Sequence, residues 1–245
     1  MESVTLHILV VLFLATMIRS TFGFGEALFA VPLLALRIPL TVAAPLAVLV
    51  SITIAFVVVV QDWQHVHLPS VGGLLASTVL GIPVGLLLLK AGNPHIVKAA
   101  LAVILICFSL YCLVGPALLT LQNDSKRWLL LCGFCAGVLG GAYGMNGPPL
   151  VLYGAMRRWS AQQFRATLQG YFLPASVLGM TSYWFAGLWT PTVTHDYLWS
   201  LPVVLPAILL GRLFNRRLHG EQFLRYVYLG LAAVGCMLLV QTIRA

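Results

Sequence analysis

Residues 21–32 read TFGFGEALFAVP, and residues 143–153 read YGMNGPPLVLY. Each stretch places two glycines, a polar residue and proline inside a run that is otherwise apolar enough to cross a bilayer. Glycine and proline weaken the hydrogen-bonded backbone that lipid requires. The two stretches therefore predict helices that are broken at membrane depth. Interrupted apolar segments at corresponding places in two halves of a chain indicate the binding site of a transporter.

The composition is that of an integral membrane protein. Of the 245 residues, 60% are hydrophobic and 8% are charged, and the mean hydropathy is +0.98, which lies far outside the range of soluble domains. The formal net charge of +8 comes from short basic clusters between apolar runs. This pattern is typical of loops held on the cytoplasmic side of a membrane, so we expect membrane lipid and no nucleic acid as a partner. The first residues include Glu2 and no Lys or Arg, so we expect no cleaved signal peptide.

Apolar runs long enough to span a bilayer, at about 20 residues per crossing, predict an all-α polytopic protein with about eight transmembrane helices. The runs are 4–36 (interrupted near 23–26), 41–60, 69–89, 95–118, 127–157 (interrupted near 144–149), 162–186, 197–217 and 222–243. The polar connections between them are short and leave no room for a separate soluble domain.

The chain also repeats itself, which predicts two four-helix repeats, 1–121 and 122–245, in one membrane domain, each with its first helix broken. The matching pairs are Gly23 with Gly144 and Arg37 with Arg158, each 121 residues apart, and Gly85 with Gly211, 126 residues apart. Four crossings per repeat is an even number. We therefore expect both repeats to enter the membrane from the same side, with a pseudo-symmetry axis along the membrane normal.

The basic residues predict the orientation in the inner (plasma) membrane. In an eight-crossing arrangement, most of them fall in the connections on one side, which is then cytoplasmic, and both termini lie outside. A complete hairpin at each break would give each half an odd number of crossings. Equivalent basic clusters would then lie on opposite faces, so the charge pattern disfavours complete hairpins, but it leaves open a shallow re-entrant dip at each break.

The breaks predict an anion site. A helix that begins inside the membrane presents unpaired N–H groups and the positive end of its dipole, and such an end binds anions. The second half-helices are expected to begin near Glu26 and near Gly147. Two such ends facing each other would form a compact pocket for a small oxyanion. The predicted substrate-binding residues are Arg19, Thr21, Gly23, Gly25, Asn146, Gly147, Tyr153 and Gln169.

Three charged residues allow two interpretations each. Arg19 is expected either to bind the anion through charge-assisted hydrogen bonds or to pair with Glu26. Glu26 is expected either to exchange a proton that is linked to anion movement, because intramembrane ionisable groups are functional candidates, or to serve as the structural partner of Arg19. Arg165 either guides anions at the cytoplasmic mouth or anchors the start of the sixth crossing by the positive-inside rule.

The remaining motifs predict neither a metal site nor an enzyme. Cys132 and Cys135 have C-x-x-C spacing, but they lie in an apolar run with no histidine nearby, which favours packing of small apolar side chains. His65 and His67 are explained by the polarity of an interfacial turn. No nucleotide-binding motif and no constellation of nucleophile and base is found, so no cofactor is expected. A membrane scaffold would leave the paired breaks unexplained.

The residues resemble those of a known family. A Gly-x-Gly break followed by apolar residues and Pro32, the sequence GMNGPPLVLY at 144–153 and FRAT at 164–167 are similar to the TauE/SafE sulfite exporter family of membrane permeases, over essentially the whole chain. The resemblance implies a proton-linked secondary transporter of small sulfur-containing anions such as sulfite, sulfoacetate or other organosulfonates. A permease for another small anion or organic acid is the alternative, and a homo-oligomer is compatible with either. Glu26 and Asn146 stand where the family often has glycine.

Overall fold

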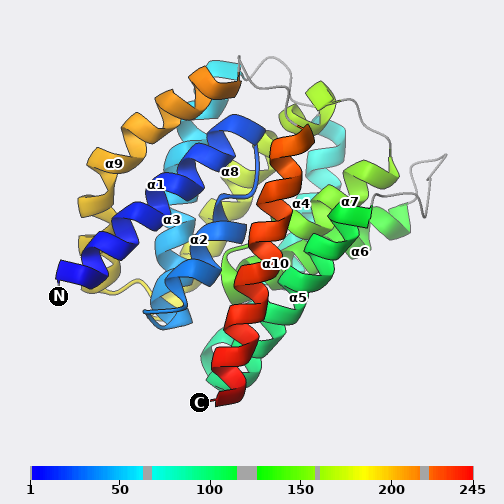
Figure 1. The fold of residues 1–245 in the computed structure, drawn as a ribbon. Coiled ribbons are helices and arrows are strands. Elements are labelled where there is room, and N and C mark those ends of the chain that lie inside the picture. Colours follow the sequence, from blue (N-terminus) through cyan, green and yellow to red (C-terminus); the bar gives the residue numbers. More distant parts are fainter. Residues whose placement is uncertain (1, 63–67, 115–125, 158–160, 216–220, 245) are drawn as a thin grey trace.

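The computed structural model describes residues 2–62, 68–114, 126–157, 161–215 and 221–244, and these form ten helices (Figure 1). The helices are α1 (Glu2–Phe22), α2 (Glu26–Leu34), α3 (Leu40–Asp62), α4 (Leu68–Ala91), α5 (Pro94–Val114), α6 (Lys126–Tyr143), α7 (Gly147–Met156), α8 (Ala161–Phe185), α9 (Pro191–Asn215) and α10 (Glu221–Arg244). The all-α prediction is confirmed, since the described residues include no strand. The two predicted interruptions are also confirmed, at residues 23–25 and 144–146.

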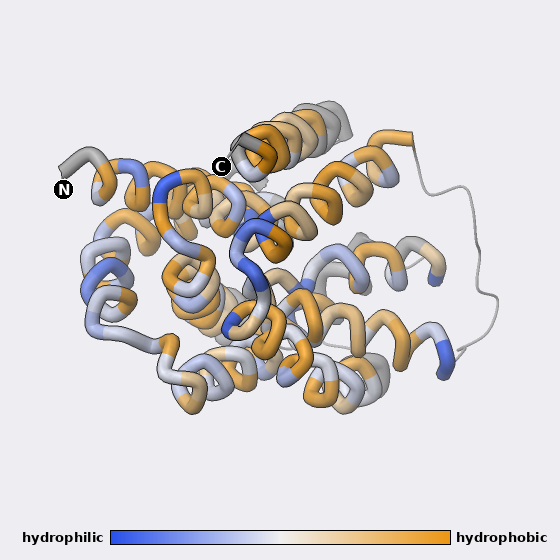
Figure 2. The backbone as a smooth tube through the Cα atoms, turned by 90° about the horizontal axis from the view of Figure 1, so that it is seen from below, coloured by the Kyte–Doolittle hydropathy of each residue, from blue (hydrophilic) through white to orange (hydrophobic). Residues whose placement is uncertain are grey.

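Five of these helices are long and apolar enough to cross a membrane. Their spanning segments are Val4–Thr21, Leu40–Val57, Val71–Ala91, Pro94–Val114 and Pro191–Leu213. In Figure 2, hydrophobic residues recur along the helices, and several of the most hydrophilic residues lie at turns and helix ends. Many of the apolar side chains face outward, such as Leu80 and Phe185, as expected where lipid replaces water as the solvent. The predicted count of eight crossings remains a prediction.

The chain reverses direction at the first break, where the sequence predicts one continuing crossing. Arg19, near the end of α1, pairs with Glu26 at the start of α2, whereas His7, near the start of α1, lies 3.0 Å from the carbonyl oxygen of Leu33 near the end of α2. Helices α1 and α2 therefore form an antiparallel hairpin. The prediction of a single interrupted crossing is wrong here, because two glycines with positive φ allow a reversal as readily as a kink.

The predicted relation between the two halves is wrong as well. Helices α5 and α10 close the two halves, and they run antiparallel: Gly235 packs against Ala102 and Ile106, while Thr242 lines the same cavity as Pro94 at the start of α5. Repeats that entered from the same side would make these helices parallel. Each half contains an additional short helix, α2 or α7, which the prediction counts as part of a crossing. The extra helix changes the number of chain reversals in each half, on which the predicted orientation depends.

Helices α4 and α6 are joined by a seam of glycines. Gly73 packs beside Leu129 and Gly85 beside Val138, so the two helices are parallel. A Cβ atom added at Gly85 would lie 2.0 Å from the carbonyl oxygen of Val138, so the two backbones touch. Small residues at a spacing of four allow such close approach in membrane helices. Helices α1 and α9 have a similar contact, because Gly211 packs on Met17 and Ser20.

Substitution of Gly85 by Ala tests the seam. The added methyl group meets backbone atoms that cannot rotate away, so we expect Gly85→Ala to lower the free energy of unfolding by about 1–3 kcal/mol, measured by thermal or denaturant unfolding in detergent. Gly72→Ala is the matched control on the same helix, because Gly72 is exposed and a Cβ atom there has no neighbour within 4 Å. Equal stability of the two variants would contradict backbone contact at Gly85.

Candidate functional site

The two breaks meet around a small cavity. The first break contributes Gly25 and Glu26 to its lining, and the second contributes Met145, Asn146 and Gly147. The cavity measures about 20 Å³, which suffices for roughly one water molecule. A sulfur oxyanion is larger than a water molecule. The cavity in the described conformation is therefore too small for such an ion, and a ligand of that size requires it to widen.

Both breaks begin with the same backbone feature, a glycine with positive φ after the last helical turn. Helix α1 is followed by Gly23 with φ 84°, and α6 is followed by Gly144 with φ 66°. Their amides bond to the carbonyls of Arg19 and Gly140, four residues earlier. A left-handed glycine after the last turn is a common end of a helix, because glycine adopts this conformation without steric cost. Gly25, with φ 99°, then begins α2.

The two helix starts differ as anion sites. Helix α2 has no side-chain cap, so no capping side chain competes with a ligand for its first amides, and its first residues line the cavity. Helix α7 begins Gly147-Pro148-Pro149, and proline has no N–H to donate. The second break therefore offers fewer backbone N–H donors than the first, whereas the sequence predicts two similar helix starts. An anion between the breaks would rely mainly on the first.

The first break holds a buried ion pair. Nη1 of Arg19 donates to Oε2 of Glu26 at 2.6 Å and to the hydroxyl of Ser51 on α3. Arg19 and Glu26 are only 3% and 1% exposed, and the guanidinium carbon lies 5.1 Å from the centroid of the Phe172 ring, a cation–π distance. The pairing of Arg19 with Glu26, one of the two interpretations drawn from sequence, is therefore observed.

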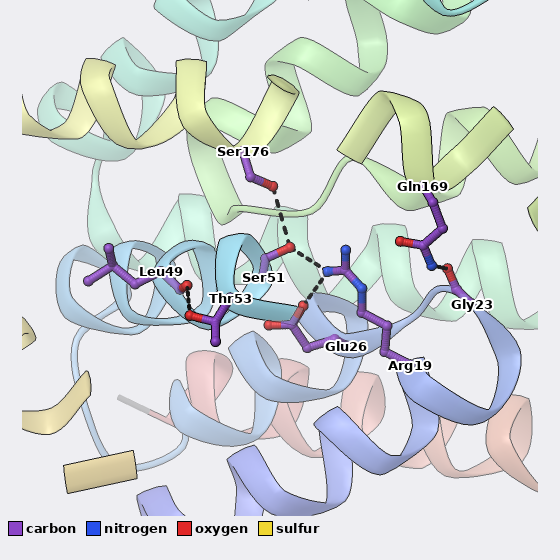
Figure 3. Close-up of polar contacts among 8 residues, drawn as sticks. All are labelled: Arg19, Gly23, Glu26, Leu49, Ser51, Thr53, Gln169 and Ser176. Atoms are coloured by element: carbon purple, nitrogen blue, oxygen red, sulfur yellow. Dashed lines mark hydrogen bonds and ion pairs between the residues drawn. The ribbon is translucent and has the colours of Figure 1, made fainter. Parts of the chain in front are cut away.

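The ion pair leaves donors and acceptors unused. Nε and Nη2 of Arg19 and Oε1 of Glu26 are buried and have no hydrogen-bond partner among the described residues. Unsatisfied buried polar atoms are costly, and the side chains of both residues line the cavity. Figure 3 shows the pair with Ser51, whose hydroxyl also accepts a hydrogen bond of 3.4 Å from Ser176 on α8. An oxyanion with several acceptor atoms would satisfy the guanidinium donors.

Gln169 and Thr21 brace the first break from outside the cavity. Nε2 of Gln169, on α8, donates to the carbonyl oxygen of Gly23 at 3.0 Å, while its Oε1 has no partner among the described residues. Figure 3 shows the Gln169 side chain reaching Gly23 beside Arg19. The hydroxyl of Thr21 donates to the carbonyl oxygens of Met17 and Gly211, at 2.8 and 3.2 Å, and so ties α1 to α9.

Asn146 connects the second break to the rest of the bundle. A Cβ atom at Gly140 would lie 2.4 Å from Oδ1 of Asn146, so this glycine makes room for the amide. Nδ2 of Asn146 donates to the hydroxyl of Tyr171 at 3.5 Å. Tyr171 shares a 2.7 Å hydrogen bond with Thr78, which donates to the carbonyl oxygen of Gly133 on α6. Asn146 is thereby held at the cavity by residues of α4 and α8.

The structure gathers some of the predicted site residues and separates others. The cavity is lined by five of them: Arg19, Gly25, Glu26, Asn146 and Gly147. The lining does not include Thr21, Gly23, Gln169 or Tyr153, although Tyr153 is fully buried on α7. Arg165 lies on α8, and its side chain falls outside the described residues. Ser51, Phe172 and Ser176 also line the cavity and were not predicted from the sequence. For the two serines, the only available signal was a hydroxyl within an apolar helix.

The other polar motifs do not join this site. Cys132 is a buried thiol and Cys135 an exposed one, and neither forms a disulfide. His65 and His67 lie outside the described residues. In the described part of the chain, no group of three or more His, Cys, Asp or Glu side chains is placed to hold a metal ion.

Comparison with known proteins points to one family. The family described as "Sulfite exporter TauE/SafE" matches residues 8–238. A protein of Cupriavidus necator named "Probable sulfite/organosulfonate exporter TauE" is 26% identical over 184 residues, which cover 75% of this chain and 71% of that protein. No solved structure matches the chain.

Removal of one partner tests the buried ion pair. Arg19→Met leaves the carboxylate of Glu26 buried without its cation, so we expect the protein to lose about 3–5 kcal/mol of stability, measured by unfolding in detergent. The double variant Arg19→Met/Glu26→Gln removes both charges and should recover most of this loss. The exposed Arg37, changed to Met, is the control. A double variant as unstable as the single one would mean that the two charges do not interact.

Proposed function

The chain belongs to the TauE/SafE sulfite exporter family, and from this membership we propose that it transports a small sulfur-containing oxyanion, such as sulfite or an organosulfonate, bound between the two breaks. The family is one of membrane transporters, and the apolar spanning helices agree with a multi-pass membrane protein. The name of the Cupriavidus necator relative supports sulfite or organosulfonate as the cargo class.

One observation carries the binding site: a buried arginine with unused donors lines the cavity where the breaks meet. A guanidinium presents several N–H donors in a fixed plane and suits two oxygens of one oxyanion. Arg19 has two nitrogens available, Nε and Nη2. The amides at the start of α2 and the amide of Asn146 would supply further donors. Sulfite and sulfonates carry three oxygens, which matches donors arriving from several directions.

Glu26 makes the site sensitive to protonation. In the described structure the carboxylate and an incoming anion would compete for the same guanidinium. An anion that binds Arg19 beside a charged Glu26 would bring two negative charges together in a buried site. Protonation of Glu26 removes this repulsion and frees Nη1 of Arg19. We therefore propose that one proton on Glu26 accompanies each bound anion, so that transport is proton-linked.

The contacts between helices support a duplicated architecture with inverted halves. The proposed repeats are 1–121 and 122–245. The α4–α6 contact has its counterpart in the contact between α1 and α9, because Gly85 with Val138 corresponds to Gly211 with Met17 at the offsets seen in the sequence. Helices α5 and α10 pair with each other, as do α3 and α8. Inverted repeats around a central site are common in transporters that alternate access by moving one half.

The revised arrangement keeps the predicted orientation in the inner membrane. The ends of the described helices away from the termini carry Lys126, Arg127, Arg157, Arg165, Arg212 and Arg225, and those near the termini carry Arg37, Lys90, Lys98 and Arg244. The richer end is cytoplasmic by the positive-inside rule. Both termini then lie outside, as expected from the sequence, although the basic residues divide between the faces differently.

Transport by Arg19 variants tests the binding site. We expect purified protein in liposomes to take up radiolabelled sulfite and methanesulfonate in preference to acetate. Arg19→Gln should lower the initial rate by about 100-fold, because two charge-assisted hydrogen bonds are lost. The exposed residue Arg37, changed to Gln, should leave the rate unchanged. Uptake of acetate in preference to both sulfur anions would contradict the proposed substrate class, and full activity of Arg19→Gln would contradict the site.

Glu26→Gln tests proton linkage. Methanesulfonate is the suitable substrate, because it remains an anion across the physiological pH range, so that any proton movement must involve the protein. We expect wild-type liposomes to show a proton flux with each anion pulse, read by an internal pH dye. The variant should exchange labelled for unlabelled methanesulfonate without proton flux. Proton flux of wild-type size in Glu26→Gln would remove Glu26 from the coupling step.

A further inference from the structure

Helix α8, from the second half of the chain, braces the backbone of the first break. Gln169 is only 8% exposed, and its Nε2 donates to the carbonyl oxygen of Gly23 at 3.0 Å. The N–H of Gly23 in turn donates to the carbonyl oxygen of Arg19 at 2.6 Å. Figure 3 shows the amide nitrogen of Gln169 directed at Gly23. Both backbone polar groups of this glycine are therefore fixed, one by its own helix and the other by α8.

The same face of α8 also surrounds the guanidinium. Phe172 lies three residues after Gln169, and the centroid of its ring is 5.1 Å from the guanidinium carbon of Arg19. Ser176 lies seven residues after Gln169 and donates to the hydroxyl of Ser51, which is bonded to Nη1 of Arg19. Residues at these spacings share one face of a helix. This face of α8 thus contacts both the backbone of the first break and the surroundings of its arginine.

Helix α8 is itself fixed to the helices around the second break. Tyr171 shares a 2.7 Å hydrogen bond with Thr78 on α4. Tyr183 donates to the carbonyl oxygens of Gly140 and Gly141 on α6, at 2.9 and 3.0 Å. Both tyrosines are fully buried. The hydrogen bond from α8 to the first break therefore also connects that break to the helices that hold the second one.

The other half contains an equivalent contact, made by packing instead of a hydrogen bond. At the offset of 121 residues, Gln169 corresponds to Val48 on α3, and Gly23 corresponds to Gly144. A Cβ atom at Gly144 would lie 2.8 Å from Cγ2 of Val48. The corresponding positions of α3 and α8 therefore each contact the first glycine of the break in the other half. A contact that recurs through different chemistry indicates that the fold uses this position to hold a break.

We propose that Gln169 is a positioning residue for anion binding, which holds Gly23 and thereby keeps the guanidinium of Arg19 at the cavity. The inference rests on the proposed function for the anion itself. Gln169 does not line the cavity, so it acts through Arg19 and not by contact with the ligand. Without the amide donor, the carbonyl of Gly23 loses this hydrogen bond, and the last turn of α1 rearranges. A small displacement of a binding group lowers affinity, because several hydrogen bonds must form in one geometry.

Magnetic resonance of the guanidinium tests this position without any ligand. The protein carries isotope-labelled arginine in nanodiscs, and the Nε–H signal of Arg19 is assigned by its absence in Arg19→Gln. We expect Gln169→Met, which keeps the length of the side chain and removes the donor, to shift this signal by more than its width. Tyr183→Phe is the matched control, because it also removes buried hydrogen bonds from α8 to backbone carbonyls, but at α6. An unshifted signal in Gln169→Met, or an equal shift in Tyr183→Phe, would overturn the proposal.

A double-mutant cycle tests the route through Arg19. Methanesulfonate is titrated by calorimetry into the wild type, Gln169→Met, Arg19→Gln and the double variant. We expect the dissociation constant to rise about tenfold in Gln169→Met and about 100-fold in Arg19→Gln, with no further rise in the double variant. Wild-type affinity in Gln169→Met, or single effects that multiply in the double variant, would overturn the proposal. Absence of methanesulfonate binding in the wild type would count against the proposed function alone, since the resonance comparison needs no anion.

Discussion

Separating a guanidinium from a carboxylate in a membrane interior has a high free-energy cost. The contact between Arg19 and Glu26 therefore constrains how the surrounding helices are arranged. Each charge alone would be strongly destabilised at that depth. Their contact requires the end of α1 and the start of α2 to lie side by side, which the reversal at Gly23 and Gly25 provides. Ser51 and Phe172 complete the surroundings of the guanidinium from α3 and α8. The first break is therefore held by a buried ion pair as well as by packing.

The second break is held in a different way. It contains neither the arginine nor the glutamate: Gly140 and Gly147 stand at the positions, 121 residues on, that correspond to Arg19 and Glu26. Hydrogen bonds take the place of charge, from Asn146 through Tyr171 and Thr78 to the backbone of α6. The glycine seam joins α6 to α4 by backbone contact, so this break is attached to a rigid element. Charge on one side and a neutral hydrogen-bonded frame on the other make the cavity asymmetric.

The sequence predicted the breaks well because their cause is local. A glycine that must adopt positive φ, and a proline that is tolerated at a helix start, are visible in Gly23, Gly144 and Pro148 without any tertiary information. The direction of the chain after Gly23 was not predictable in this way, because a kink and a reversal require the same residues. The predicted orientation of the two halves was wrong for the same reason, because it depended on an even number of crossings in each half. Ser51 and Ser176 were missed because a single serine in an apolar helix does not reveal which side chain it will meet.

The opposite charges of Arg19 and Glu26 also bear on how the membrane voltage would act on transport. Membrane voltage does work only on net charge that moves, at about 2.3 kcal/mol per elementary charge for each 100 mV. The ion pair is neutral, and in the proposed mechanism it stays neutral when a proton binds the carboxylate and a monovalent anion binds the guanidinium. A carrier that works in this way would exchange between two electrically equivalent states. Its direction would be set by the concentrations of anion and proton on the two sides and not by the resting potential.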